Sequence, residues 1–176
     1  MDFFEAVNAR YSHKQRFLPE PVPRAHLEKI ARAGLAAPTG SNSQSVELVI
    51  LDDRTVLREV CEVTSTDGLR STPAAIAVMT DRCTQSGPLN FEKEDYSAAV
   101  ENMLLAATAL GYASVWLDSI LYDQETAARV RATLGAPEGM TMWAILPIGK
   151  PSGEETRRKK KPFEDRLSYN RYGARD

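Results

Sequence analysis

The chain has 176 residues, the length of one globular domain, and a chain of this size buries roughly 70% of the surface of its unfolded state. It therefore needs neither disulfides nor a structural metal to hold a core. Its 22 lysines and arginines nearly balance 24 aspartates and glutamates, for a net charge of -2, which argues against a protein that binds nucleic acid by neutralising phosphates.

Membrane insertion and secretion are not expected either. The longest apolar stretches fall well short of the roughly 20 residues that span a bilayer, and the opening Met-Asp-Phe-Phe-Glu-Ala-Val lacks the pattern of a secretion signal. Cys61 and Cys83 stand in neither a zinc nor a Cys-x-x-Cys spacing, which suits a reducing compartment. We expect a single domain, residues 1–176, in the cytoplasm, with no nucleic-acid or membrane partner.

The first half of the chain alternates helical and strand patterns. Asp2 can cap the first helix, and Pro38 with Gly40 should end the second and open a polar loop. The predicted elements are a helix at 2–10, a helix at 24–36, a strand at 46–51, a helix at 54–62, a turn at 67–68 and a strand at 74–80.

The second half should contain the central helix of the core. Residues 96–110 include only three clearly polar side chains, so this helix is apolar on most of its circumference, and Gly111 should end it. The remaining predicted elements are a strand at 113–118, a helix at 124–134 and a strand at 141–148. Pro147 places the last strand near an edge of the sheet, or near its own end.

The tail from Pro151 to Asp176 has few apolar side chains, and they are widely spaced. Such a segment cannot bury enough surface by itself. We expect it either to be disordered or to lie against another surface, and we favour the surface of a dimer partner.

Three runs of residues have the chemistry of one anion site. They are Arg10-Tyr-Ser-His-Lys14, the polar loop Ala37-Pro-Thr-Gly-Ser-Asn-Ser-Gln44, and the basic run Arg157-Arg-Lys-Lys-Lys161. Guanidinium, hydroxyl and ammonium groups hold phosphate by charge-assisted hydrogen bonds, and a small polar loop can add backbone N–H groups. We find no nucleophile, metal or dinucleotide motif, so the reactivity is expected to come from a bound phosphorylated cofactor.

The order of these runs resembles the nitroreductase family of flavin mononucleotide (FMN) enzymes. Four further stretches agree with the family and extend the match over nearly the whole chain: Ser71–Val78, Glu101–Gly111, Val115–Ser119 and Ile145–Pro151. Strand and helix alternation alone would favour a doubly wound parallel sheet. The resemblance instead implies an α+β fold, a three-layer sandwich with a mixed, mostly antiparallel sheet between helices, and a C-terminal segment, residues 151–176, that extends onto the partner of a homodimer.

The resemblance also implies which residues bind FMN. Arg10, Tyr11 and Ser12 match the phosphate-binding segment, and Lys14 matches the residue at the pyrimidine edge of the ring, where a cation favours acceptance of negative charge. Arg158 and Lys160 match two cations that complete the phosphate site. The alternatives are a capped helix end with a solvated arginine, a surface lysine, and a solvated basic run.

Two more segments match flavin contacts in the family. The loop residues Pro38, Thr39, Gly40, Asn42 and Gln44 would contact the flavin in part from the second subunit, and a plain turn is the alternative. The strand end Leu117, Asp118 and Ser119 would face flavin N5 with a backbone N–H, while Trp116 is expected to pack in the core. The chain departs from the family at Gln44-Ser45-Val46, where relatives usually continue Gln-Pro-Trp.

The function implied by this resemblance is FMN-dependent oxidoreduction. NADH or NADPH would reduce the flavin, which would then reduce a nitroaromatic, quinone or similar small acceptor in a ping-pong cycle. Two alternatives stay open: the same fold with a different redox reaction, such as dehydrogenation, flavin cleavage or dehalogenation, and a flavin-binding or interaction protein without turnover.

Overall fold

A computed structural model describes residues 1–81, 89–153 and 157–174 of the chain. Cys83 and most of the short stretch between the second strand and the central helix lie outside the described residues. The elements in chain order are α1 (Phe3–Ala9), α2 (Arg24–Leu35), the 3-10 turn η1 (Gly40–Asn42), β1 (Val46–Leu51), α3 (Arg54–Thr64), α4 (Asp67–Arg70), β2 (Ala74–Asp81), α5 (Glu92–Ala109), β3 (Ala113–Ser114), the 3-10 turn η3 (Ser119–Tyr122), α6 (Gln124–Thr133) and β4 (Met140–Gly149).

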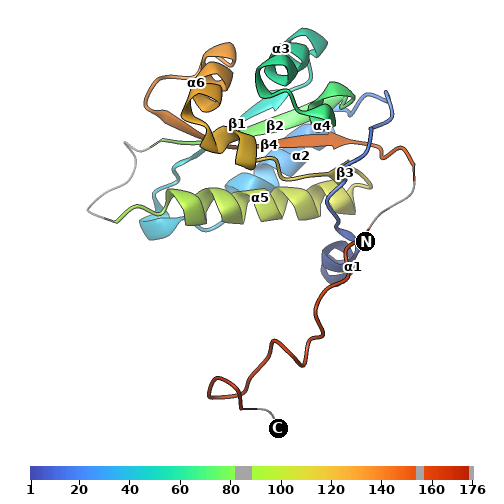
Figure 1. The fold of residues 1–176 in the computed structure, drawn as a ribbon, viewed down its shortest axis with the longest axis vertical. Coiled ribbons are helices and arrows are strands. Elements are labelled where there is room, and N and C mark those ends of the chain that lie inside the picture. The colour runs from blue at the N-terminus through green and yellow to red at the C-terminus, as the bar shows by residue number, and fades with distance from the viewer. Residues whose placement is uncertain (82–88, 154–156, 175–176) are drawn as a thin grey trace.

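The strands form one sheet in the order β1-β2-β4-β3, and every named pair is antiparallel. One isolated parallel bridge, between Ser12 and Ser114, adds the front segment to the β3 edge. Helices α2 and α5 cover one face of the sheet, and α3 and α6 cover the other (Figure 1). The predicted α+β sandwich with a mostly antiparallel sheet is confirmed.

Strand β2 shows how the sequence builds two cores at once. Side chains of a strand alternate between faces, and here both faces are buried, so the strand is apolar from Ala74 to Met79. Ala74, Ile76 and Val78 pack with α2 and α5, whereas Ala75 and Ala77 pack with α3 and α6.

A bulge in β4 changes which face of the sheet its side chains occupy. Val78 pairs with Ala144 and Met79 pairs with Met142, so Trp143 is the extra residue. Because of this insertion, Met142 and Ala144 belong to opposite cores although they are two positions apart. The bulge also places the Trp143 indole N–H 2.7 Å from Thr80 Oγ1.

Of the two alternatives predicted for Pro147, the structure supports the second: this residue lies near the end of β4, which is an interior strand. The predicted strand 113–118 is also shorter than expected: only Ala113–Ser114 is a strand, and Leu117 makes an isolated bridge to Ile145. The two pairings keep one register, which places Val115 opposite Pro147. Since Pro147 has no N–H to donate, the ladder breaks there.

The central helix begins four residues earlier than predicted, at Glu92, and the expected turn at 67–68 is the short helix α4. The acidic start of α5 reads as a loop in the sequence, yet Glu92 and Asp95 are each only 1% exposed. Glu92 accepts hydrogen bonds from Thr80 and Asn90. Gly111, with φ of 76°, ends the helix as predicted.

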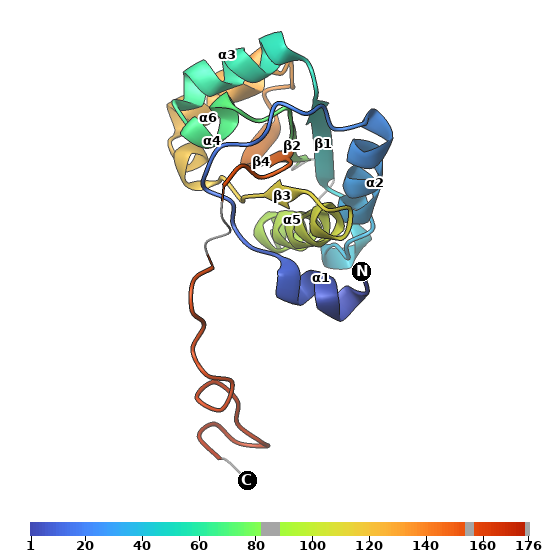
Figure 2. The same cartoon turned by 90° about the vertical axis from the view of Figure 1, so that its right-hand side faces the viewer.

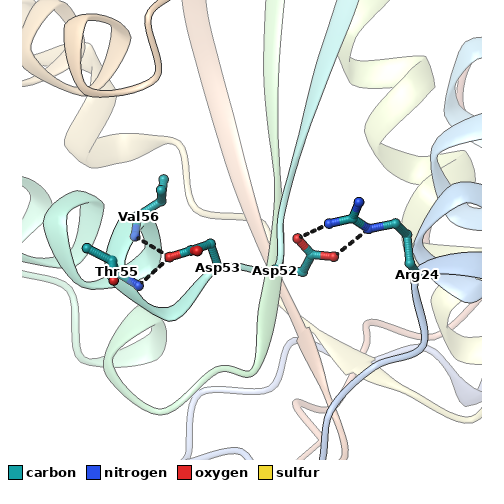
Figure 3. A network of polar contacts seen from close by, with 5 residues as sticks. All are labelled: Arg24, Asp52, Asp53, Thr55 and Val56. Atoms are coloured by element: carbon teal, nitrogen blue, oxygen red, sulfur yellow. Dashed lines mark hydrogen bonds and ion pairs between the residues drawn. The ribbon is translucent and has the colours of Figure 1, made fainter.

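Polar contacts at the end of β1 fix the start of α3 and of α2. The Asp53 carboxylate accepts hydrogen bonds from the backbone N–H groups of Thr55 and Val56 and so caps α3. Asp52 receives two hydrogen bonds from the Arg24 guanidinium, at 2.8 and 2.7 Å (Figure 3). These two adjacent carboxylates tie one helix from each layer to the same strand end.

The tail extends away from the body of the fold, on the side of α1 (Figure 2). Its aromatic side chains Phe163, Tyr169 and Tyr172 are exposed, and so are Phe3 and Phe4 of α1, at 64% and 74%. Within the described residues, no helix is long and apolar enough to cross a membrane.

Candidate flavin site

The front segment is held by the end of α1 and by β3. Asp2 and Glu5 form a capping box at the start of α1, and the Arg10 N–H closes its end on Ala6. Ser12 bridges to Ser114, and the His13 N–H donates to the Ser114 carbonyl at 2.9 Å. The segment that follows α1 therefore runs beside β3, directly before the predicted flavin-edge residues.

His13 positions this segment rather than serving as a reactive group. Its ring is 2% exposed, lies edge-on to Phe17, and its Nε2 is 2.9 Å from the Arg16 carbonyl oxygen. With His13 buried, its neighbours Ser12 and Lys14 are exposed on the surface of the segment.

The start of the tail meets the end of α1, as the anion-site prediction requires, but through Arg157. Its guanidinium donates to the carbonyls of Asn8 and Ala9 and lies 5.9 Å from the centre of the Tyr11 ring. Arg158 and Lys160, the two predicted phosphate ligands, follow directly and are exposed. Segments about 150 positions apart in sequence are thus side by side.

Three buried polar atoms line this region without a hydrogen-bond partner among the described residues. They are Arg10 Nε, Ser114 Oγ and Trp116 Nε1; the nearest ion-pair partner of Arg10 Nε is Glu101 Oε1, at 3.7 Å. Buried polar groups normally have a hydrogen-bond partner. The three atoms therefore fit a ligand that supplies oxygen atoms along the path from Arg10 to Trp116, as the phosphate and hydroxyl groups of FMN would.

The polar loop is organised by one buried carboxylate. Asp95 Oδ1 accepts the Gly40 N–H at 2.7 Å, and its Oδ2 accepts the hydroxyls of Ser43 and Ser45 at 3.0 and 2.8 Å. Ser45, the departure from the family pattern, is fully buried by this contact. The loop is not an ordinary solvated turn but a preformed structure.

The backbone of the same loop has left-handed dihedral angles at three residues. Ser41, Asn42 and Gln44 all have positive φ, between 51° and 55°, a conformation that costs energy for residues other than glycine. The Gln44 N–H donates to Thr39 Oγ1 at 3.0 Å. Pro38 and Thr39 lead into this turn from the end of α2, and Gly40 holds the loop at the first turn of α5 through its bond to Asp95.

The strand end at 117–119 lies against an aromatic cluster. The Leu117 N–H donates to Ile145, which leaves Asp118 and Ser119 as the residues of the three whose N–H could face flavin N5. Asp118 Oδ2 accepts the Tyr122 hydroxyl at 3.3 Å, and the negative charge of Asp118 raises the pKa of Tyr122.

The aromatic cluster connects this strand end to α5. Tyr96 stacks on Trp143 at 4.8 Å between ring centres and meets Trp116 edge-on at 5.9 Å. The prediction that Trp116 packs in the core is thus supported for its ring, although its indole N–H is one of the three buried atoms that lack a partner.

The structure therefore brings three of the four predicted segments together on one chain. The front segment, the strand from β3 to Ser119 and the start of the tail are neighbours, whereas the loop is anchored at Asp95. The loop contacts α5 at Asp95, and Arg10 of the front segment contacts the same helix at Glu101. These two residues are six positions apart, about 9 Å along the helix axis. Sequence reasoning missed Asp95 and Ser114, because their partners lie far away in the chain.

Comparisons with known proteins identify the family of the chain. A model of the nitroreductase family matches residues 7–66 and 61–150. An Archaeoglobus fulgidus protein described as a "putative NADH dehydrogenase/NAD(P)H nitroreductase" is 35% identical over 130 residues, which are 73% of this chain and 74% of that protein.

Solved structures show the same fold. A Parabacteroides distasonis protein of the same description superposes with a TM-score of 0.84 at 29% identity, covering 97% of this chain and 98% of its own. A Desulfovibrio desulfuricans protein, described as a "putative nitroreductase" in complex with FMN, superposes with a TM-score of 0.77 at 28% identity, covering 93% and 98%. The chain belongs to the nitroreductase family.

Proposed function

We propose that the protein takes hydride from NADH or NADPH and passes two electrons to a nitroaromatic, a quinone or a similar small acceptor, with FMN as its resident cofactor. Family membership makes the chain an NAD(P)H-dependent oxidoreductase. The names of its relatives refer to NADH, NAD(P)H and nitro substrates, and one neighbour holds FMN. The carrying observation is the convergence of the front segment, β3 and the tail around polar atoms that lack partners.

In this proposal the chain's own residues bind and orient the cofactor. Arg10, Tyr11 and Ser12 hold the phosphate, and the tail contributes cations beside them. Arg158 and Lys160 are the proposed ligands, and Arg157 fixes their place because it is bound to the carbonyls at the end of α1. Bidentate guanidinium contacts and hydroxyl donors suit a phosphate dianion.

Other residues set the reactivity of the ring. FMN supplies the redox chemistry when it is bound. The Lys14 ammonium would lie at the pyrimidine edge and stabilise negative charge there, while a backbone N–H of Asp118 or Ser119 would face N5. The loop residues Pro38, Thr39, Gly40, Asn42 and Gln44 would contact the flavin of the partner subunit.

We also propose that the protein is a cytoplasmic homodimer. The exposed adjacent rings of Phe3 and Phe4 in α1 support the dimer, because contiguous exposed apolar side chains mark protein–protein contact sites. The tail would cross onto the second subunit.

The proposal is tested by anaerobic stopped-flow reduction of the FMN-loaded protein with NADH and with NADPH, followed by a panel of acceptors. We expect at least one nicotinamide to bleach the flavin and an acceptor to restore its colour, two electrons per cycle. Lys14→Ala should keep FMN but slow the reduction, and Lys14→Arg should restore it. If the protein binds FMN but neither NADH nor NADPH reduces it, the result would favour the alternative of a flavin-binding or interaction protein without turnover.

A further inference from the structure

The helical layer opposite α1 and α5 contains a cavity of about 430 Å³ that takes no part in the proposed flavin site. It lies between α3 and α4 and reaches Thr72, just before β2. Cavities that bind small molecules have volumes of roughly 300–1,000 Å³, so this one has the size for a compact ligand. Helices α3 and α4 lie on the far side of the sheet from α1 (Figure 1).

The floor of the cavity is apolar. Leu57 and Leu69 are 3% and 2% exposed, and Cys61 is 8% exposed. These side chains belong to the second core, where they pack together with Val60 and residues of the sheet. A ligand that enters the cavity would therefore meet an apolar surface.

The rim of the cavity is cationic. Arg54 and Arg58 stand one turn apart on α3, and Arg70 ends α4, while Glu62 is the one acidic residue of the described lining. Three guanidinium groups around one opening are notable on a chain whose net charge is -2.

The existing contacts of these arginines leave donors for a ligand. Arg54 uses Nη1 on the Thr72 carbonyl at 3.3 Å. Arg70 Nε is 3.7 Å from Asp67, but both side chains are more than 70% exposed, and such a surface pair contributes little. Each guanidinium has five N–H donors in a planar fork that matches phosphate or carboxylate oxygens.

From this combination we infer a second ligand site: the cavity between α3 and α4 binds a small organic anion, with its phosphate or carboxylate on Arg58 and Arg70 and its apolar body over Leu57, Cys61 and Leu69. An inorganic anion would contact only the arginines of the rim and would leave the apolar floor exposed to water. A neutral apolar molecule would use the floor and make no use of the charge on Arg58 and Arg70.

The test is calorimetric titration of the FMN-loaded protein with 1-naphthyl phosphate, and with 1-naphthol as the neutral match. Loading with FMN keeps the phosphate probe out of the proposed flavin site. We expect the phosphate to bind at least tenfold more tightly than the naphthol, and the double variant Arg58→Gln, Arg70→Gln to remove that preference, since charge-assisted hydrogen bonds of this kind are worth about tenfold or more.

The control is Arg129→Gln, which removes one positive charge from the exposed face of α6, outside the cavity. It should leave the binding of 1-naphthyl phosphate unchanged. Equal affinity for phosphate and naphthol, or undiminished phosphate binding by the double variant, would overturn the inference. Flavin absorbance and its reduction by nicotinamide should not change in the double variant, so this result is separate from the test of the proposed function.

Discussion

A single carboxylate, Asp95, determines the shape of the polar loop. It is 1% exposed, and its oxygens receive the Gly40 N–H and two serine hydroxyls. A buried acceptor that serves three donors is costly to remove, because every donor loses its partner at once. The loop therefore depends on a residue about 50 positions away that makes no motif with it.

We predict that Asp95→Ala destabilises the fold by roughly 2–4 kcal/mol, since it leaves buried donors unsatisfied. Asp95→Asn is the matched variant: it keeps one acceptor oxygen and the side-chain volume, so its loss should be smaller. Urea unfolding followed by circular dichroism measures both. Equal unfolding midpoints for the wild type and Asp95→Ala would contradict this role.

The pair of Arg24 and Asp52 predicts a small dependence of stability on pH. Hydrogen bonds from Arg24 lower the pKa of Asp52 in the folded state below its ordinary value of about 3.9. A carboxylate with a lowered pKa contributes stability above its unfolded pKa, and this contribution is lost as the pH falls through the folded value.

Arg24→Gln should therefore lower the free energy of unfolding slightly at pH 7, and the difference from the wild type should begin to shrink below about pH 4, as the pH falls toward the lowered pKa of Asp52. Thermal unfolding at a series of pH values measures it, with the exposed Arg129→Gln as control. If the difference in unfolding free energy between the wild type and Arg24→Gln grew as the pH fell, the result would contradict this role of the pair.

At the scale of elements, the loop is also fixed by contact between Gly40 and Phe91, just before α5. A side chain on Gly40 would collide with the Phe91 ring, so glycine is needed here for close approach rather than for a positive φ. This contact joins the start of η1 to the start of the central helix.

We expect Gly40→Ala to cost about 1–3 kcal/mol, the usual range for overpacking, and Phe91→Leu to reduce that cost in the double variant. Gly139→Ala is the control, because the added carbon would meet open space. The free energies of unfolding of the wild type, Gly40→Ala, Phe91→Leu and the double variant form a double-mutant cycle. An additive cycle would show that the two residues are not in contact.

The elements also show what the sequence can and cannot predict. Apolar spacing locates α2 and α3, and nearly continuous apolar runs locate α5 and β2, because both signals are local in the sequence. The break between β3 and Leu117 was not predictable, since it depends on Val115 standing opposite Pro147 in another strand. The acidic start of α5 was missed for the same reason: Glu92 and Asp95 are buried only by partners that lie elsewhere in the chain.

For the site, the residue types of the front segment and of the tail predict that the two lie together, and the structure places Arg157 against the end of α1; phosphate binding there stays a prediction. The exact tail residue at the end of α1 was not predictable: the structure uses Arg157 there. A run of five basic residues has no internal signal that sets its register.

For the whole molecule, the exposed aromatic residues of α1 and the extended tail leave a surface that one subunit does not cover. We predict that the protein sediments at twice its 19.5 kDa chain mass. Phe3→Glu with Phe4→Glu should give a monomer, because the two added like charges would oppose burial of this face.

Arg129→Glu, which also adds negative charge but on α6, should remain a dimer. Sedimentation equilibrium at several concentrations separates the two cases. A wild-type protein that is monomeric at all concentrations, or a dimeric Phe3→Glu, Phe4→Glu variant, would contradict the proposed arrangement.

The most direct measurement is the affinity of the protein for FMN compared with riboflavin, which differ by the phosphate alone. If the front segment and the tail hold that phosphate, the wild type should bind FMN at least roughly 100-fold more tightly than riboflavin, as two or three charge-assisted contacts provide. Arg10→Ala should lose most of this preference, and Arg129→Ala should keep it. A wild type that binds both flavins equally, or an Arg10→Ala variant with the full preference for FMN, would contradict the account.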